Sequence, residues 1–270
     1  MRAFAKKLRV LLAVQYAYML EYRGEIFLWI VVTVLPLIML GPWMAAGASG
    51  RFPLDEREFA RYFVAVFVVR QFSLCWVIYE FEGLVVSGRL SPQLLLPIDP
   101  AWRYIAAHVS EFASRAPFVL AITLVVVAMF PAAVTADDGG WLLPGPGAIA
   151  LAAIATASAF ALRFLMQYSL SMGALWIERI SAFDRLQMLP YLFLSGLVAP
   201  LEVFPERVRE VVLWTPFPYL VWFPARLLAG GDVGPPARAV GIMLGWSLAF
   251  WVLMRWLWRR GLRHYSAMGA

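Results

Sequence analysis

Residues 80–100 read EFEGLVVSGRLSPQLLLPIDP, and the rest of the chain is organised around this stretch. Long apolar runs lie on both sides of it, so we expect a short excursion into water between two membrane spans. The stretch carries acidic and basic residues and a Gly-Arg-Leu-Ser turn, then three leucines that end at Pro97. This pattern predicts a short helix at the membrane surface, with its charges outward and its leucines inward. We expect another protein to bind the chain there.

The composition indicates a membrane protein. The chain is 62% hydrophobic and 15% charged over 270 residues, whereas a soluble domain carries about 25% charged residues. Only helices and closed barrels satisfy their backbone hydrogen bonds in a bilayer, and the apolar runs here are continuous rather than alternating. The predicted fold class is therefore an all-α integral membrane protein.

Charge and cysteine content argue against several other classes. The formal net charge is +6, but the basic residues flank apolar runs instead of forming a face, so we expect no nucleic-acid partner. The single Cys75 excludes an internal disulfide and a cysteine-based metal site. The two histidines, His108 and His264, lie far apart in sequence, and we therefore expect no metal.

The apolar runs predict six membrane spans. A kink is expected at Pro36 in the first span, a turn at residues 137–140 and a charged turn at residues 178–185, which overlaps the start of the fifth span. The spans are expected at residues 26–46, 60–79, 111–133, 147–176, 183–199 and 240–258.

The amino end, residues 1–25, is expected to form a helix that lies on the membrane. Its apolar residues recur near 3.6-residue spacing, and Lys6 and Arg9 lie opposite them. The alternative is a solvated basic start to the first span. We see no pattern of a secretory signal peptide.

Basic residues predict the orientation. With the amino end in the cytoplasm, fourteen Lys and Arg residues, Arg115 included, fall on the inner side and seven on the outer side. Cytoplasmic loops carry the excess of Lys and Arg, so both termini and residues 80–100 are expected in the cytoplasm.

The segment between the fifth and sixth spans contains several prolines that divide it into pieces too short to cross a bilayer. We expect residues 200–236 to form a re-entrant hairpin on the outer side, since irregular backbone at that depth must pack against protein or water. Its marker residues are Pro200, Glu202, Pro205 and Pro216.

Taken in order, these motifs resemble the membrane subunit of an ABC-2 type transporter, in an uncharacterised bacterial subgroup. The resemblance covers essentially the whole chain, 1–270, as a single domain. It is carried by the amino-terminal surface helix, by Glu82 to Arg89-Leu90-Ser91, by Leu94-Leu95-Leu96-Pro97 and by the proline-rich hairpin.

The resemblance implies a permease subunit of an ATP-driven exporter in the bacterial cytoplasmic (inner) membrane. The implied partners are a separate ABC ATPase, a second copy or a paralogous permease, and membrane lipid. The chain has no G-x-x-x-x-G-K-[ST] loop, so ATP and Mg²⁺ are expected on the ATPase and no cofactor in this chain. The implied ATPase-coupling residues are Glu82, Gly83, Arg89, Leu90, Ser91, Leu94, Leu95, Leu96 and Pro97.

Four polar residues fall within spans: Arg70, Gln71, Arg163 and Gln167. A charge at such depth is costly and usually faces protein or water. We see no carboxylate at the depth of Arg70, which leaves a carbonyl, an amide, water, a second subunit or an anionic substrate as its partner. Arg163 is expected to snorkel or to meet Glu111. These residues are predicted to line the translocation pathway or a subunit interface.

Alternative functions remain open at this stage. One is a membrane-embedded enzyme that modifies lipid, with Arg70 or Arg163 binding a phosphate. A channel is disfavoured because no filter motif is present. An intramembrane serine protease is disfavoured although residues 47–50 read GASG, because no histidine is placed to activate Ser49. His108 and Glu111 share a helix face, which we interpret as an interfacial helix start rather than an acid–base pair.

Overall fold

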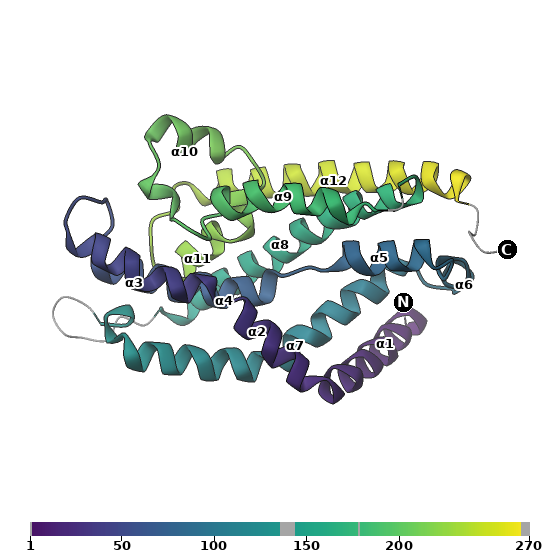
Figure 1. Ribbon diagram of the computed structural model, residues 1–270, viewed down its shortest axis with the longest axis horizontal. Helices are drawn as coiled ribbons and strands as arrows, with labels where there is room; N and C mark the ends of the chain where they lie inside the picture. The colour runs from purple at the N-terminus through teal and green to yellow at the C-terminus, as the bar shows by residue number, and fades with distance from the viewer. Residues whose placement is uncertain (1, 136–143, 178, 266–270) are drawn as a thin grey trace.

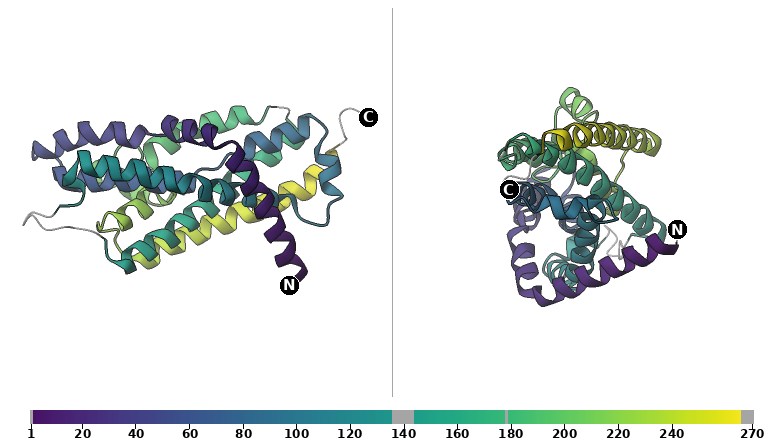
Figure 2. Two further views of the ribbon diagram at one scale, coloured as in Figure 1. Left: turned by 90° about the horizontal axis from the view of Figure 1, so that it is seen from below. Right: turned by 90° about the vertical axis from the view of Figure 1, so that its right-hand side faces the viewer.

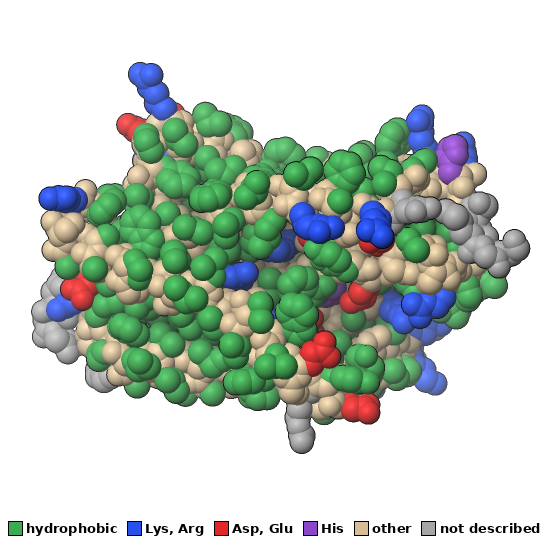
Figure 3. Space-filling view, viewed as in Figure 1, with side chains coloured by type: hydrophobic (Ala, Val, Ile, Leu, Met, Phe, Trp, Pro, Cys, Tyr) green, Lys and Arg blue, Asp and Glu red, His purple; other side chains and the backbone are tan. Residues whose placement is uncertain are grey.

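The computed structural model describes residues 2–135, 144–177 and 179–265, and every regular element in these ranges is a helix. Long helices run along one axis of the molecule (Figure 1). The amino end, α5 and α6 lie at the same end of the bundle as the last turns of α12, and α10 lies at the other end. Hydrophobic side chains cover most of the face in Figure 3, with charged side chains toward its ends and around a hollow near its middle.

Five helical segments in the described part of the chain are long and apolar enough to cross a membrane, so this is a multi-pass membrane protein. The expected sixth, at residues 183–199, is not confirmed. The helix there, α9 (Ser181–Leu194), has 14 residues and is about 21 Å long, less than the ~30 Å hydrocarbon core. The five segments are Gly24–Ala48, Glu56–Val86, Pro100–Met129, Pro146–Leu175 and Ala237–His264.

The first helix, α1 (Arg2–Glu21), lies across the bundle instead of along it (Figure 2). It packs on α7 (Pro100–Met129), and the Ser110 hydroxyl donates to the Leu12 carbonyl at 3.2 Å. The chain then turns at Tyr22 into α2 (Arg23–Val32). α1 therefore covers most of residues 1–25, for which a helix on the membrane surface stays a prediction.

The first span is broken, slightly before the expected kink. α2 ends at Val32 and α3 (Leu35–Ala48) follows, while the Thr33 hydroxyl donates to the Ile30 carbonyl at 2.9 Å. Pro36 lies in the first turn of α3. Proline is tolerated there because the first backbone N–H groups of a helix have no partner within it.

The second span is also broken, and it is longer than expected. α4 (Glu56–Ser73) starts at a capping box formed by Asp55 and Glu58. The chain leaves the helix at residues 74–76 and continues as α5 (Val77–Val86). The expected end at residue 79 is therefore wrong. One face of α5 buries Val77, Ile78, Phe81 and Val85, and Glu80 and Glu82 flank this face on opposite sides.

The third span begins earlier than expected, because α7 starts at Pro100 instead of residue 111. The Asp99 side chain accepts a hydrogen bond from the Ala101 backbone N–H at 2.9 Å, which caps the helix. Arg115, expected at the inner surface, is buried near the middle of α7 with 1% of its surface exposed. The helix ends at Met129 and is followed by η1 (Pro131–Ala133).

The remaining long helices follow the apolar runs. α8 (Pro146–Ser171) and η2 (Met172–Leu175) occupy the expected fourth span, and α12 (Pro236–His264) contains the expected residues 240–258. The turn expected at residues 137–140 lies outside the described residues, as does residue 178 of the expected charged turn.

The proline-rich segment forms short helices. They are η3 (Leu201–Val203), α10 (Glu206–Val212), η4 (Phe217–Leu220) and α11 (Trp222–Leu228). α11 is buried against α4 and α8. The Tyr62 hydroxyl on α4 donates to the Gly196 carbonyl at 2.6 Å, which ties the entry of this segment to the core.

Two apolar clusters lie on either side of the break in the second span. The first surrounds α4, α11 and the hairpin and includes Phe63, Val66 and Leu220. The second surrounds α5, the first turns of α7 and the carboxyl-terminal half of α8 and includes Phe81 and Tyr168. The break at residues 74–76 therefore joins two separately packed halves.

Candidate functional site

Residues 80–100 form the end of α5, a turn, the short helix α6 (Leu90–Leu94) and an irregular segment that leads into α7. Gly88 makes the turn with φ +69°, a conformation that favours glycine. Of the leucines, only Leu90 faces inward and is fully buried. Leu94, Leu95 and Leu96 are 36%, 87% and 54% exposed, so their side chains are available to a surface outside the chain.

Besides its apolar packing, this segment is joined by hydrogen bonds to three other parts of the chain that the structure describes. The Glu82 carboxylate accepts hydrogen bonds from the backbone N–H of Ser181 at 2.6 Å and from its hydroxyl at 3.0 Å, at the start of α9. The Lys7 ammonium on α1 donates to the Pro97 carbonyl at 3.3 Å. The Ser91 hydroxyl donates to the Tyr265 hydroxyl, just after α12, at 3.4 Å.

One of these contacts changes the role expected for Glu82, whereas Arg89 and Gly83 stay at the surface. Glu82 was expected to face a partner protein, but its carboxylate is occupied by Ser181. Arg89 remains exposed, and its Nε donates to the Ser87 hydroxyl at 2.9 Å. Gly83 is also exposed, on the outer face of α5.

His108 stabilises the break between α4 and α5. Its Nδ1 donates to the Tyr104 carbonyl at 2.8 Å, which leaves Nε2 as the acceptor for the Trp76 backbone N–H at 2.9 Å. His108 is 1% exposed. The expectation of an interfacial helix start is therefore wrong for His108. No glycine or proline at residues 74–76 signalled the break.

Glu111 pairs with Arg115 one turn along α7, not with Arg163 as expected. The Arg115 guanidinium also donates to the Gln71 carbonyl at 3.1 Å. A buried charge is tolerated when it is paired and hydrogen-bonded. The pair therefore joins α7 to α4 close to the break in the second span.

Arg70 and Gln71 both reach the break in the first span. The Arg70 guanidinium donates to the Thr33 carbonyl at 3.3 Å, so its partner is a backbone carbonyl, one of the expected alternatives. The Gln71 amide donates to the Thr33 hydroxyl at 2.9 Å. The interruption of the first span thus supplies acceptors to two polar residues of the second.

Arg70, Arg163 and Gln167 line one cavity of about 210 Å³ between α4, α5, α8 and α9. The Arg163 guanidinium lies over the Tyr191 ring, 4.1 Å from its centre. No ion pair joins Arg70 to a carboxylate among the described residues, but one carboxylate does reach this cavity. Asp184 lines the same cavity and accepts hydrogen bonds from the Gln167 amide at 3.2 Å and from the Tyr79 hydroxyl at 3.0 Å.

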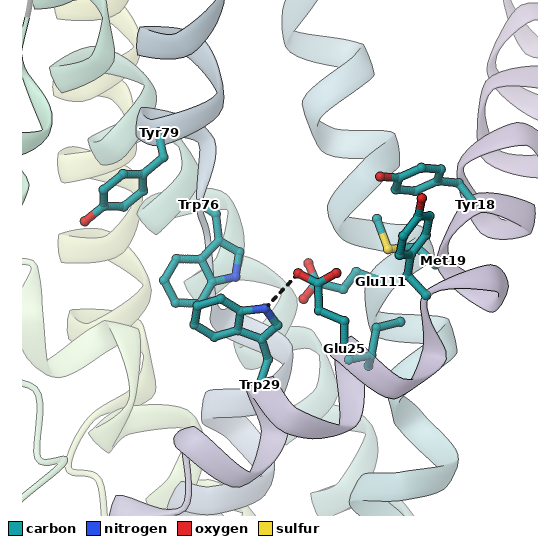
Figure 4. Close-up of a pocket in the computed structure, with 9 residues that line it drawn as sticks. Tyr18, Met19, Glu25, Trp29, Trp76, Tyr79 and Glu111 are labelled. Carbon is teal, nitrogen blue, oxygen red and sulfur yellow. Dashed lines mark hydrogen bonds between the residues drawn. The ribbon is translucent and has the colours of Figure 1, made fainter.

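A second cavity, of about 480 Å³, lies between α1, α2, α5 and α7 (Figure 4). Aromatic side chains dominate its wall, and the Trp29 indole donates to the Glu25 carboxylate at 3.3 Å. The Trp29 and Trp76 rings lie 5.6 Å apart. The sequence did not indicate this cavity, because its wall comes from four separate helices.

The hairpin residues have structural contacts. Glu202 forms an ion pair with Arg226 on α11 at 2.9 Å and accepts a hydrogen bond from the Trp222 indole. Pro200 and Pro216 are buried and Pro205 is exposed. These contacts hold α11 against the start of the hairpin.

In the part of the chain that the structure describes, neither Ser49 nor any group of metal-ligating side chains forms a site for chemistry. The Ser49 hydroxyl donates to the Ala46 carbonyl of its own helix at 2.6 Å. Across residues 2–135, 144–177 and 179–265, no group of three or more His, Cys, Asp or Glu side chains is placed to hold a metal ion.

Comparison with known proteins identifies a family. The family model described as ABC-2 family transporter protein matches residues 58–269, which is more than half of the chain. A comparison with the curated proteins finds no match.

Proposed function

The chain belongs to the ABC-2 transporter family, and from this membership we propose that it is the permease subunit of an ATP-driven exporter, coupled through residues 80–100 to a separate ATPase. The ATPase binds ATP and Mg²⁺, and the permease forms half of the translocation pathway. Both termini and residues 80–100 face the cytoplasm of a bacterial cell, and the protein lies in the inner membrane. A second copy or a paralogous permease supplies the other half.

The observation that supports this proposal is the connectivity of residues 80–100. One segment contacts α1 through Lys7, α9 through Ser181 and the end of α12 through Tyr265. A force applied to this segment would reach three helices directly. Few surface loops are tied to so many parts of a fold, and the arrangement suits a site where an outside motor acts.

The chemistry of the exposed part suits a protein partner. Leu95 and Leu96 are more than half exposed at the end of the bundle, and fully burying one leucine contributes about 1.5–3 kcal/mol. Arg89 lies in the turn before them and carries an exposed positive charge. An apolar groove with an acidic rim on the ATPase would match this surface.

The same proposal implies six crossings in total, of which the fifth in chain order is the one that the long helices do not supply. With α9 and α12 both joined to the coupling end, the chain between them must reach the other end and return. α9 runs toward the hairpin helices α10 and α11 (Figure 1). We infer that α9, with the irregular residues after it, completes the fifth crossing and that residues 200–236 form the re-entrant hairpin.

The test compares two substitutions on the exposed part of residues 80–100, one that reverses a charge and one that removes an apolar side chain, with a matched substitution at the opposite end of the molecule. Arg89→Glu and Leu95→Asp are expected to reduce co-purification of the ATPase and to uncouple transport from ATP hydrolysis, with the permease still inserted in the membrane. Val208→Asp, on α10, is 47% exposed before substitution and serves as control. Normal transport in both coupling variants would refute docking through residues 80–100.

The lipid-modifying enzyme considered above remains distinguishable by experiment. The family is a membrane component of transporters, which favours transport. Turnover of lipid by the purified chain in the absence of an ATPase would favour the enzyme instead.

A further inference from the structure

The cavity between α4, α5, α8 and α9 contains two buried cations. Arg70 and Arg163 are 7% and 8% exposed, and among the described residues neither guanidinium forms an ion pair. Arg70 has one hydrogen bond, to the Thr33 carbonyl, and Arg163 lies over the Tyr191 ring. Burial of a charge is unfavourable unless the charge is paired, so these residues lack the compensation that Arg115 and Arg226 have.

Four side chains that line this cavity each carry a buried polar atom that has no hydrogen-bond partner. Donors left unpaired away from water are rare in folded proteins and call for an explanation. Arg70 and Gln167 come from facing helices, and Tyr191 approaches from α9. The atoms are Arg70 Nε, Arg163 Nη1, Gln167 Oε1 and Tyr191 Oη.

The charge of the lining is positive. Three arginines, Arg70, Arg163 and Arg185, line the cavity together with one carboxylate, that of Asp184. Asp184 already accepts hydrogen bonds from Gln167 and from Tyr79. Three of the four unpaired atoms, Arg70 Nε, Arg163 Nη1 and Tyr191 Oη, can donate a hydrogen bond, whereas Gln167 Oε1 can only accept one. A ligand that satisfies these three donors and offsets the two arginine charges must accept hydrogen bonds and carry negative charge.

We propose that this cavity binds one anionic group, a phosphate or a carboxylate, on the cargo of the transporter. The inference rests on the proposed function and adds to it the chemical class of the substrate. Guanidinium groups bind such oxygens through paired, charge-assisted hydrogen bonds. The Tyr191 hydroxyl supplies a further donor, and the cavity has room for one such group.

The surroundings of the cavity suit an amphipathic molecule. Leu74, Met166 and Met188 supply apolar wall beside the arginines. The outward face of α9 is apolar, with Leu186 and Leu189 67% and 60% exposed. A hydrocarbon tail would lie along this face while the anionic group enters the cavity.

The cavity also adjoins the break in the second span. Leu74 and Trp76 line it and belong to residues 74–76, which connect α4 to α5. A bound anion would therefore contact the segment that connects α4 to α5, and α5 leads directly into residues 80–100. This position gives the cargo a direct structural route to residues 80–100.

The experiment measures binding to the purified full chain without any ATPase. Short-chain phosphatidic acid is titrated into protein in detergent, and the affinity is obtained from the shift in thermal unfolding. Arg70→Gln and Arg163→Gln are each expected to weaken binding about tenfold to a hundredfold, since each removes a charged donor. Arg238→Gln, at an exposed arginine over the Trp214 ring, is the control and is expected to bind normally.

Tyr191→Phe tests the cavity with a change that is not expected to affect folding, in case the arginine variants misfold. It removes only a hydroxyl that has no partner, so the free protein is expected to be at least as stable as the wild type. Its affinity for short-chain phosphatidic acid is expected to fall about tenfold. A stable Tyr191→Phe protein with unchanged affinity would contradict the assignment of this hydroxyl and the proposal with it.

Further probes distinguish the sources of the anion. A short-chain diacylglycerol, which lacks the phosphate, is expected not to bind. Stabilisation by inorganic phosphate would assign the site to a free anion, and stabilisation only in vesicles that contain phosphatidic acid would assign it to a lipid headgroup. Equal binding of neutral and anionic probes, or dissociation of a dimer by the arginine variants without any anion binding, would overturn the proposal.

The result of the anion-binding experiment does not depend on the test of ATPase docking. Arg89→Glu lies outside the cavity and is expected to bind the anion normally even when the ATPase is lost. Failure of anion binding with normal ATPase coupling would remove the substrate assignment and leave the proposed function standing.

Discussion

Replacing Glu82 with alanine is expected to loosen the start of α9, because the Glu82 carboxylate accepts both hydrogen-bond donors of Ser181. A hydrogen bond to a charged group contributes about 1.5–3 kcal/mol, and the half-buried position of this contact favours the lower end. Glu82→Ala, which removes both, should therefore cost about 3 kcal/mol. Ser181→Ala keeps the backbone donor and should cost about 1.5 kcal/mol.

Hydrogen exchange on residues 179–188, in protein held in nanodiscs, measures this local opening. Every 1.4 kcal/mol is about a tenfold change in exchange, so we expect roughly a hundredfold loss of protection in Glu82→Ala and roughly tenfold in Ser181→Ala. The double variant should resemble Glu82→Ala, because the carboxylate is absent from both. Glu80→Ala, an exposed carboxylate on the same helix, is the matched control.

Two results would refute this reasoning. Protection in Glu82→Ala within about threefold of the wild type would mean that the contact contributes little. Fully additive losses in the double variant would mean that the two residues act separately. Either result would also weaken the role proposed for residues 80–100, since this contact is their connection to α9.

Two further substitutions test the packing. Gly196→Ala is expected to lower the free energy of unfolding by about 3 kcal/mol in chemical unfolding, since Gly196 has φ +84° and an added Cβ would overlap the Tyr62 hydroxyl. The control, Gly50→Ala, has φ +65° and nothing within 4 Å of the added Cβ, so it should cost only about 1 kcal/mol. Equal costs for the two variants would contradict the role of the close contact at Gly196. Glu111→Gln leaves buried Arg115 without its counter-charge and is expected to cost about 3–5 kcal/mol of stability. Adding Arg115→Met should recover most of this stability in thermal unfolding. A double variant that is no more stable than Glu111→Gln would count against the ion pair.

The sequence predicted the elements that depend on local pattern. Apolar runs predicted an all-helical membrane protein, and its class is confirmed by five long apolar helices. Proline and glycine markers predicted the interruption near Pro36 and the turn before α6. The family resemblance is confirmed by the match over residues 58–269.

What the sequence did not predict depends on contacts between distant residues. The break at residues 74–76 has no proline or glycine and is stabilised by His108 from another helix. Glu82 was interpreted as a free surface charge because its partner, Ser181, is 99 residues away. Asp184 was assigned to a turn, and only the packing of α9 on α8 brings it to Gln167.

If an ATPase acts on residues 80–100 as proposed, the break in the second span is the point about which α5 and α6 would turn. α5 has 10 residues and is therefore about 15 Å long. Tilting it by about 20° around residues 74–76 would carry α6 sideways by about 5 Å, close to the rise of one helical turn. The swing would change the contacts of Trp76 with His108, of Tyr79 with Asp184 and of Glu82 with Ser181, whereas α4 lies on the other side of the break. A stroke of that size is large enough to slide one helix past another by a full side-chain row.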